Sequence, residues 1–462
     1  MRRLLDRFSF LPIPFKIVLS FAFVILIGSF LLALPISQQA SSQATYFDHL
    51  FTAVSMVCVT GLFTEPLAYT YTIFGQIIGL ILIKLGGLGL ITLVATIVMQ
   101  LGRRVSMKDE VTLQQALNRG DMIGFREFLI SVVKYTFLIE GTGAVFLSFH
   151  MVPLFGWTKG TFTSIFLSIS AFNNAGFDNL GTTSLQGFVD SHIVNIVIPL
   201  LIIIGGIGFS VWFDVAQNFK AFIAVRSWID FKGRYRRLKL HTRLVLNWTI
   251  FLIFAAMVLF MLSEWNNNET IGGLNFIGKM QATFFQAVTL RTAGFGTVGY
   301  THLHLFTIIF MTVFMFIGGS PGGTAGGAKT STVALVVKLL WAEITGQQHV
   351  HYQKRTLDDE IVQRALVIVV MFVILNFLGL SLMSIFDETV PMQYLFFEAV
   401  SALGTVGLSA DLTSELSRGS QTVIMFLMFI GRLGPITIFT ALGLFDRKQK
   451  PKVYASGNIL IG

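Results

Sequence analysis

The sequence predicts an all-α membrane protein built from four tandem repeats, with eight spanning helices and four re-entrant segments around one axis. Of its 462 residues, 54% are hydrophobic and 12% are charged, which is more apolar surface than a soluble chain of this length could bury. Long apolar stretches recur, and each is near or above the roughly 20 residues that a helix needs to cross a bilayer. They are 15–34, 193–213, 244–262, 365–386 and 422–445.

The first apolar stretch is expected to stay in the protein as a spanning helix. Arg2, Arg3 and Arg7 precede it, as basic residues precede the core of a secretory signal peptide. Its length exceeds the about 7 to 15 residues of such a core, so the signal-peptide alternative is the weaker one. The single cysteine, Cys58, excludes an internal disulfide framework.

The basic residues behind the net charge of +9 gather in alternate connections between the apolar stretches. The basic clusters lie at the N-terminus and at 103–126, 220–243, 338–364 and 447–452. The other connections carry mostly acids, for example Asp48, Glu65, Asp178 and Glu264. Because basic loops stay on the cytoplasmic side, both termini are expected there and the number of crossings is even. This placement does not indicate nucleic-acid binding.

Four glycines mark the internal repeat. Gly61, Gly176, Gly294 and Gly407 lie 115, 118 and 113 positions apart, and a phenylalanine stands ten residues before each. A short, half-apolar segment precedes each glycine, at 46–59, 161–174, 276–292 and 392–405. These segments are too short to cross a bilayer and too apolar for solvated loops. We therefore expect four re-entrant helices, each between two spanning helices.

A second glycine signature follows each of these glycines after 24 to 29 residues and supports the same register. It reads Gly86-Gly87-Leu88-Gly89, Gly205-Gly206-Ile207-Gly208, Gly318-Gly319 and Gly431-Arg432-Leu433-Gly434. The expected boundaries are 1–100 for repeat 1, 101–222 for repeat 2, 223–345 for repeat 3 and 346–446 for repeat 4, with a cytoplasmic tail at 447–462.

Re-entrant helices that end at glycines predict one cation pore with pseudo-fourfold symmetry. The carboxyl end of a helix carries about half a negative charge and carbonyls without partners. Four such ends on one axis would replace the hydration shell of a cation, which would bind at the four glycines. Close helix packing alone would explain one glycine but not four in one register. The expected filter residues are Val59, Thr60, Gly61, Asn174, Ala175, Gly176, Thr292, Ala293, Gly294, Thr405, Val406 and Gly407.

The second helix of repeat 3 is expected to break, because a helix does not run through many glycines and a proline. A flexible loop below the filter could act as a gate. The expected gate residues are Gly318, Gly319, Ser320, Pro321, Gly322, Gly323, Thr324, Ala325, Gly326, Gly327, Lys329 and Arg432. Cations inside a membrane are expensive and suggest a function. The alternatives are that Lys329 reaches the cytoplasmic surface and that Arg432 only caps loop carbonyls.

Other motifs carry weaker expectations. Residues 323–330 nearly match a phosphate-binding loop, but Ala328 replaces the required glycine and no strand precedes it. The histidine pairs at 302 and 304 and at 349 and 351 lack further metal ligands and are expected to be solvated. Asn173 and Asn174 could present side-chain carbonyls at the pore entrance or cap a helix. Arg291 is expected to point away from the pore and to pair elsewhere.

Two other classes of protein fit the pattern less well. A carrier of organic solutes places two broken helices in symmetric halves, whereas here the quarters repeat and repeat 3 alone has the long break. A membrane-bound enzyme needs a nucleophile or a pair of carboxylates inside the membrane, and the pattern predicts neither. The chain is therefore expected to be a transporter without an organic cofactor.

The quartet of helix, filter glycine and helix resembles the Trk/Ktr/HKT superfamily of potassium transporters over essentially the whole chain. Gly404-Thr405-Val406-Gly407-Leu408 is close to the Thr-Val-Gly-Tyr-Gly of potassium channels. The lack of extra N-terminal helices and the tail 453–462 look most like the Ktr membrane subunit. A serine in the first filter goes with sodium transport in some plant members, so Gly61 implies a preference for potassium.

The resemblance also implies how such a chain works. It implies potassium uptake across a bacterial plasma membrane, with the glycine-rich break as an intramembrane gating loop and with possible sodium dependence. It further implies a homodimer on an octameric ring of cytosolic KTN/RCK-type subunits that bind ATP or ADP. The basic cytoplasmic loops, 220–243 especially, would offer the surface for that partner, and the C-terminal tail would contribute to the dimer.

Overall fold

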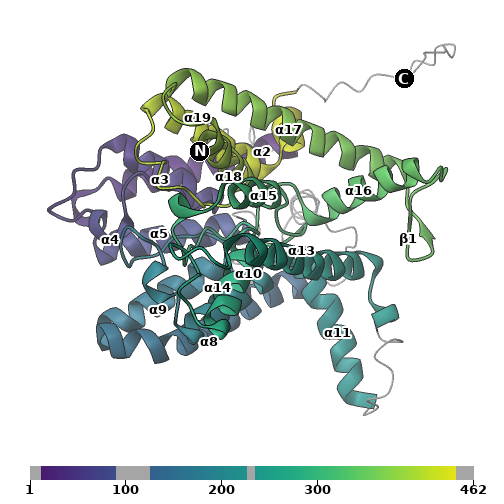
Figure 1. The fold of residues 1–462 in the computed structure, drawn as a ribbon, viewed down its shortest axis with the longest axis horizontal. Coiled ribbons are helices and arrows are strands. Elements are labelled where there is room, and N and C mark those ends of the chain that lie inside the picture. The colour runs from purple at the N-terminus through teal and green to yellow at the C-terminus, as the bar shows by residue number, and fades with distance from the viewer. Residues whose placement is uncertain (1–11, 90–124, 226–234, 444–462) are drawn as a thin grey trace, which may run out of the picture.

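The computed structural model describes residues 12–89, 125–225 and 235–443. Helices dominate these residues, and the strands β1 (His351–Tyr352) and β2 (Arg355–Thr356) form one short antiparallel hairpin. Figure 1 shows a bundle of helices from which α11, α16 and the hairpin project. The N-terminal arginines, most of the basic cluster at 103–126, residues 226–234 of the cluster at 220–243, and the tail at 447–462 lie outside the described residues.

Four long helices are long and apolar enough to cross a membrane. They are α2 (Ile13–Leu32), α8 (Phe125–Phe155), α13 (Leu240–Glu264) and α17 (Asp359–Phe386). Large apolar side chains lie exposed on their outer faces, for example Phe30, Phe149, Phe254 and Phe377. Such a surface is typical of helices that face lipid. The prediction of a helical membrane protein is thereby confirmed.

A short helix follows each long one and packs against it. The short helices are α3 (Tyr46–Cys58), α9 (Trp157–Phe172), α14 (Phe276–Thr289) and α18 (Met392–Gly404). Three begin at the first residue of the expected re-entrant segment, and α9 begins four residues earlier than 161. Thr45 and Asp48 form a capping box at the start of α3, which satisfies amide groups that the first turn leaves free.

The second helices of the second, third and fourth quarters depart from a single straight span, and that of the first quarter is described only to Leu88. These helices are α5 (Ile73–Leu88), α10 (His192–Gly206), α15 (Leu305–Phe316) and α19 (Arg418–Leu433). The expectation of continuous helices at 193–213 and 422–445 was wrong. α10 meets α11 (Phe209–Val225) at 97°, and α19 meets α20 (Pro435–Ala441) at 96°. Gly434 has a φ of 84°, which lets the chain turn between the two helices. Pro435 is the first residue of α20, a position whose N–H has no partner within the helix, so a proline costs no hydrogen bond there.

In repeat 3 the helix stops for longer, as the sequence predicts. α15 ends at Phe316, and α16 (Thr330–Ile344) begins after thirteen residues without helix. The remaining elements are the short helices η1 (Pro35–Ser37), α4 (Leu67–Thr70), η2 (Gln186–Phe188) and η3 (Tyr300–His302).

The four quarters close on themselves. The second helix of each quarter contacts the short helix of the following quarter: α5 contacts α9, α10 contacts α14, α15 contacts α18, and α19 contacts α3. The last contact joins the end of the chain to its beginning. In Figure 1 the yellow-green α19 accordingly lies beside the purple α3. The four short helices therefore occupy the inside of a closed arrangement.

An ion pair strengthens the contact between α19 and α3. Arg418 Nη1 donates to Asp48 Oδ1 at 2.5 Å, and Nη2 donates to Oδ2 at 3.2 Å. The backbone N–H and the hydroxyl of Thr45 donate to the same carboxylate at 2.9 and 2.6 Å. Burial raises the pKa of Asp48, but the hydrogen bonds from Arg418 and Thr45 outweigh burial and hold this pKa below its ordinary value of 3.8.

Replacing Arg418 with glutamine is expected to lower the free energy of unfolding by about 1 kcal/mol at neutral pH, a modest loss because the Arg418 side chain is half exposed. The pKa of Asp48 is depressed in the folded protein. Its contribution is therefore fully present above the ordinary pKa and is lost progressively as the pH falls from about 4 through the depressed pKa of the folded protein. Thermal unfolding in detergent at pH 7 and at lower pH measures the effect. A difference between wild type and Arg418→Gln that persists in acid would contradict the ion-pair explanation.

Candidate functional site

The four glycines of the repeat meet in a closed ring at the buried ends of the short helices. The carbonyl oxygen before each glycine lies against the glycine of a neighbouring quarter, so that a Cβ there would approach it within 1.9–2.8 Å. The contacts join Gly61 to Ala175, Gly176 to Ala293, Gly294 to Val406, and Gly407 to Thr60. We call these four glycines the glycine ring. Only glycine leaves room for four oxygens this close together.

The four segments follow the same backbone path. Each ring glycine has a positive φ, between 71° and 103°. The residue two positions before each glycine is also left-handed, with φ between 51° and 63°; these residues are Val59, Asn174, Thr292 and Thr405. Three of the four are β-branched, for which this conformation is strained. A strained conformation that occurs four times in one register indicates that the backbone itself forms the site.

The amide groups of these segments bond back to the short helices. Thr60 N donates to Ser55 O at 2.9 Å, and Gly61 N donates to Ser55 Oγ at 3.1 Å. In the fourth quarter, Val406 N donates to Ser401 O at 2.8 Å, and Gly407 N donates to Ser401 Oγ at 3.1 Å. The third quarter has Val288 at the matching position, so this hydroxyl is replaced there by a methyl group. Both serines stand six residues before a ring glycine, and the sequence interpretation assigned them no role as supports.

The carbonyl oxygens inside the ring remain free. Within the described residues, no hydrogen bond reaches the oxygens of Thr60, Ala175, Ala293 or Val406. Buried carbonyl groups without a partner are costly, and a cation on the ring axis would satisfy all four. Hard, uncharged oxygens are the ligands that protein sites use for dehydrated alkali cations. The donor set therefore fits such an ion as cargo.

A buried glutamate supports the fourth segment from behind, and the sequence interpretation missed it. Glu398 of α18 is fully buried, and its carboxylate accepts hydrogen bonds from Ser409 and from Thr413 Oγ1, the latter at 3.0 Å. Both hydroxyls belong to the loop that follows Gly407. Glu398 is the one acidic residue in this short apolar segment, and that isolated charge could have indicated a structural or functional role.

Residues 317–329 lie against the segments that precede two of the ring glycines. Gly318 N donates to Ala328 O at 2.8 Å, which closes the loop at its base. A Cβ on Gly326 would lie 2.1 Å from Thr405 Oγ1, so the tip touches the fourth ring segment. Thr324 Oγ1 also contacts Asn174 Oδ1 of the second segment, at 3.1 Å. The glycine-rich loop thus contacts two of the four segments.

The predicted gate cations both contact this loop. The Arg432 guanidinium donates to the carbonyl oxygens of Thr324 in the loop and of Gly86 and Gly87 at the end of α5; the Gly87 bond is 3.1 Å long. Lys329 Nζ donates to Ala325 O at 2.7 Å. Arg432 thus caps loop carbonyls, and it ties the loop to repeat 1 at the same time.

The side chains flanking the ring match one expectation and depart from another. Asn173 Nδ2 bonds to Ile169 O at 2.8 Å, which caps α9, and Asn174 Nδ2 bonds to Arg291 O at 3.2 Å. Arg291 is 5% exposed, and its Nε and Nη2 have no hydrogen-bond partner within the described residues. The expectation that Arg291 pairs elsewhere is therefore not met. Within the described chain, no Asp or Glu side chain forms an ion pair with Arg291.

The other motifs lie away from the ring. Among the described residues, no three His, Cys, Asp or Glu side chains gather as a metal site. His349 faces Asp359 at 3.5 Å, and His304 donates its backbone N–H to Glu264 at 3.0 Å. Residues 323–330 follow helix α15 rather than a strand, which does not fit a phosphate-binding loop.

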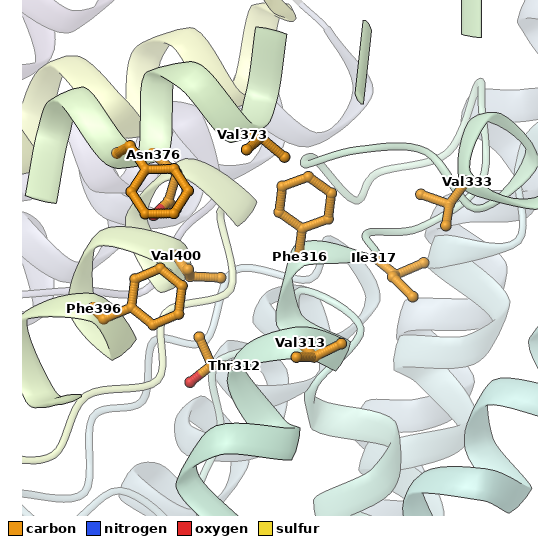
Figure 2. A pocket seen from close by; sticks show the side chains of 10 residues that line it. Thr312, Val313, Phe316, Ile317, Val333, Val373, Asn376, Phe396 and Val400 are labelled. Atoms are coloured by element: carbon orange, nitrogen blue, oxygen red, sulfur yellow. The ribbon is translucent and has the colours of Figure 1, made fainter. Parts of the chain in front are cut away.

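An apolar pocket of about 310 Å³ lies beside the glycine-rich break. Figure 2 shows its lining, which comes from α15, α16, α17 and α18. Ile317, the first residue of the break, belongs to this lining together with Phe316, Val373 and Phe396, and Thr312 and Asn376 are its polar members. Since no charged side chain of the described chain lines the pocket, a hydrated cation has no favourable site there.

Backbone carbonyl oxygens that lack hydrogen-bond partners and form a ring among apolar helices are typical of a membrane protein that transports cations. The chain belongs to the TrkH family of cation transport proteins, whose sequence model matches residues 13–446. This family membership confirms the predicted resemblance to the Trk/Ktr/HKT superfamily. It also confirms that the chain is a transporter rather than an enzyme.

Similar proteins support the family assignment. The chain is 37% identical over 454 residues to the Ktr system potassium uptake protein B of Bacillus subtilis (strain 168), covering 97% of this chain and 96% of that protein. It is 34% identical over 451 residues to the potassium/sodium uptake protein NtpJ of Enterococcus hirae, covering 96% of each. The crystal structure of the potassium transporter TrkH from Vibrio parahaemolyticus has the same fold, with a TM-score of 0.67, 19% identity, and coverage of 94% of this chain and 84% of that one.

Proposed function

We propose that this protein takes up potassium through a channel-like pore whose selectivity filter is the glycine ring. The observation that carries the proposal is the closed set of four buried carbonyl oxygens without hydrogen-bond partners among the described residues. Oxygens at this position can replace the hydration shell of an ion that passes along the ring axis. The names of the similar potassium uptake proteins favour potassium as the ion. Potassium, bound at the four glycines, is then the cargo and needs no organic cofactor.

The proposed architecture has four repeats and eight crossings. The four long helices supply four crossings, the two bent pairs supply two, and α5 and α15, which are shorter and apolar, supply the others. The repeats would divide at the boundaries expected from the sequence, near residues 100, 222 and 345. Basic connections on one side place both termini in the cytoplasm, and the bacterial relatives favour the plasma membrane.

The glycine-rich loop is proposed as the gate. Residues 318–327 contact two ring segments from one side, and Arg432 and Lys329 hold the loop through its carbonyl groups. A loop held by few contacts can move when a partner changes their balance. Two positive charges next to the path also raise the barrier for a cation. The loop and both cations would therefore limit flux in the resting protein.

The regulatory partner is proposed to act from the cytoplasm. The hairpin and the start of α17, next to the projecting α16, expose the basic side chains of Lys354, Arg355 and Arg364. The name of the Bacillus subtilis relative places it in a Ktr system. We propose a homodimer on an octameric, nucleotide-binding ring, with sodium as a second ion because one relative is named for both ions.

Rubidium uptake tests the proposal. Cells without their own potassium systems should accumulate rubidium when they express this chain together with a Ktr-type regulatory subunit, and should not accumulate amino acids or sugars. Replacing Gly61 with serine should lower the ratio of rubidium to sodium uptake about tenfold, because the side chain displaces the Ala175 oxygen. Expressed protein that transports no rubidium, or a ratio unchanged by Gly61→Ser, would refute the filter assignment.

A further inference from the structure

A buried ion pair lies behind the second ring segment. Lys84 of α5 donates a hydrogen bond to Glu140 Oε2 of α8, and the two side chains are only 13% and 4% exposed. The Lys84 ammonium also lies 4.4 Å from the centre of the Phe137 ring, a stabilising cation–π distance. Charges inside spanning helices are costly and usually serve a function. Within the described chain, neither residue bonds to the proposed gate or to the four ring oxygens.

The second oxygen of Glu140 connects this pair to the ring segment. Asn173 Nδ2 donates to Glu140 Oε1 at 2.9 Å. Asn173 ends α9, and the next residue, Asn174, has the left-handed φ of 58° that begins the path to Gly176. The Ser168 hydroxyl of α9 donates to the Glu140 carbonyl oxygen at 2.7 Å. Glu140 thus holds the end of the second short helix at two points.

The same asparagine also touches the helix that holds Arg432. A Cβ on Gly87 would lie 2.2 Å from Asn173 Oδ1, and the Gly87 carbonyl accepts from Arg432. The Asn173 side chain is therefore packed tightly between Glu140 and the end of α5. Among the described residues there is no free space into which it could move. The matching positions of the other quarters, three residues before the ring glycine, hold Cys58, Arg291 and Gly404. None of these has an amide side chain, so this connection is specific to the second quarter.

We propose that Glu140, held in place by Lys84, is a positioning residue that fixes the second filter segment through Asn173. It would thereby set the apparent affinity for potassium and the preference for potassium over sodium. The inference rests on the proposed function, because it assigns the Glu140 contact a role in the same filter. The carboxylate acts through the asparagine amide and does not touch the ion.

Two double variants separate the hydrogen bond from the charge. Lys84→Met with Glu140→Gln removes both charges and keeps an oxygen that accepts from Asn173. The KM for rubidium should stay within about twofold of wild type, because a buried ion pair can be replaced by neutral groups with little loss. Lys84→Met with Glu140→Leu removes that acceptor as well. The KM should then rise about tenfold and the rubidium-to-sodium ratio should fall by a similar factor, because the filter segment is displaced.

Asn173→Ala tests the connection from the other side. It should give the same change in KM and ratio as the double variant that carries Glu140→Leu, and combining them should add nothing further. Lys159→Met is the matched control, since Lys159 also lies over an aromatic ring, Phe155 at 5.3 Å, but is exposed. It should transport like wild type. All rates are normalised to the amount of protein in the membrane.

The proposal is overturned if the two double variants, one with Glu140→Gln and the other with Glu140→Leu, have the same KM and the same ion ratio. A merely structural role would reduce the amount of protein without changing either quantity, and that result would overturn it too. If both double variants fail to reach the membrane, an unchanged KM and ratio in Asn173→Ala overturns it alone. A wild type that takes up no rubidium refutes the proposed function instead, so the two failures are distinguishable.

Discussion

Replacing Gly407 with alanine is expected to reduce rubidium uptake about a hundredfold or more. A Cβ at this position would lie 1.9 Å from the Thr60 oxygen, the tightest contact of the glycine ring, and the φ of 88° disfavours any side chain. The new methyl group must displace the first filter segment by more than about 1 Å to reach an ordinary contact. Displacements of this size at a site that holds a ligand in fixed geometry cost about two orders of magnitude. Initial uptake rates, normalised to protein in the membrane, measure the effect.

Gly141→Ala is the matched control for this variant. Gly141 lies in the middle of α8, and a Cβ there would meet no atom within 4 Å. Transport should remain at the wild-type rate, and the unfolding temperature should rise slightly because alanine favours a helix over glycine. Uptake by Gly407→Ala at the wild-type rate would show that the ion does not pass the glycine ring.

Replacing Arg432 with glutamine is expected to raise the resting uptake rate about tenfold in cells that lack the regulatory subunit. Arg432 bonds to Thr324 of the loop and to Gly86 and Gly87 of α5. Hydrogen bonds to a charged group contribute about 1.5 to 3 kcal/mol each, and about 1.4 kcal/mol corresponds to a tenfold shift in population. Loss of the guanidinium should therefore release the loop and remove a positive charge beside the path.

Arg432→Lys separates these two causes. Lysine keeps the charge, but it cannot present the planar set of donors that bonds to three carbonyl oxygens. A rate close to that of Arg432→Gln would assign the effect to the tether, and a rate close to wild type would assign it to the charge. Equal rates in wild type and both variants would remove Arg432 from the mechanism.

The sequence predicts the parts of this structure that repeat. The four glycines share one register, and short segments between long apolar stretches have few other solutions in a membrane. The positions of α3, α14 and α18 follow from this alone. The left-handed residues before each ring glycine do not, because Val59 and Thr405 are residue types that seldom adopt a positive φ. The surrounding fold imposes this conformation.

Contacts between quarters were also beyond the reach of the sequence. Lys84 had no assigned role, since its partner Glu140 stands 56 residues further along the chain. The bends at 207–208 and 434 separate helices that form continuous apolar stretches in the sequence. Hydropathy shows that a segment is apolar, but it does not show where the helix axis changes direction. Arg291 lies next to the third ring segment, and nothing in the sequence indicates that its Nε and Nη2 lack partners among the described residues.

The contact between α19 and α3 has a consequence for biogenesis. α3 belongs to the first quarter, but one of the helices that it contacts, α19, is synthesised near the end of the chain. If the glycine ring is the filter, as proposed, a nascent polypeptide that has inserted three quarters can assemble only an open arc of oxygens, which does not surround an ion. We therefore expect no selective conduction before the last quarter has entered the membrane.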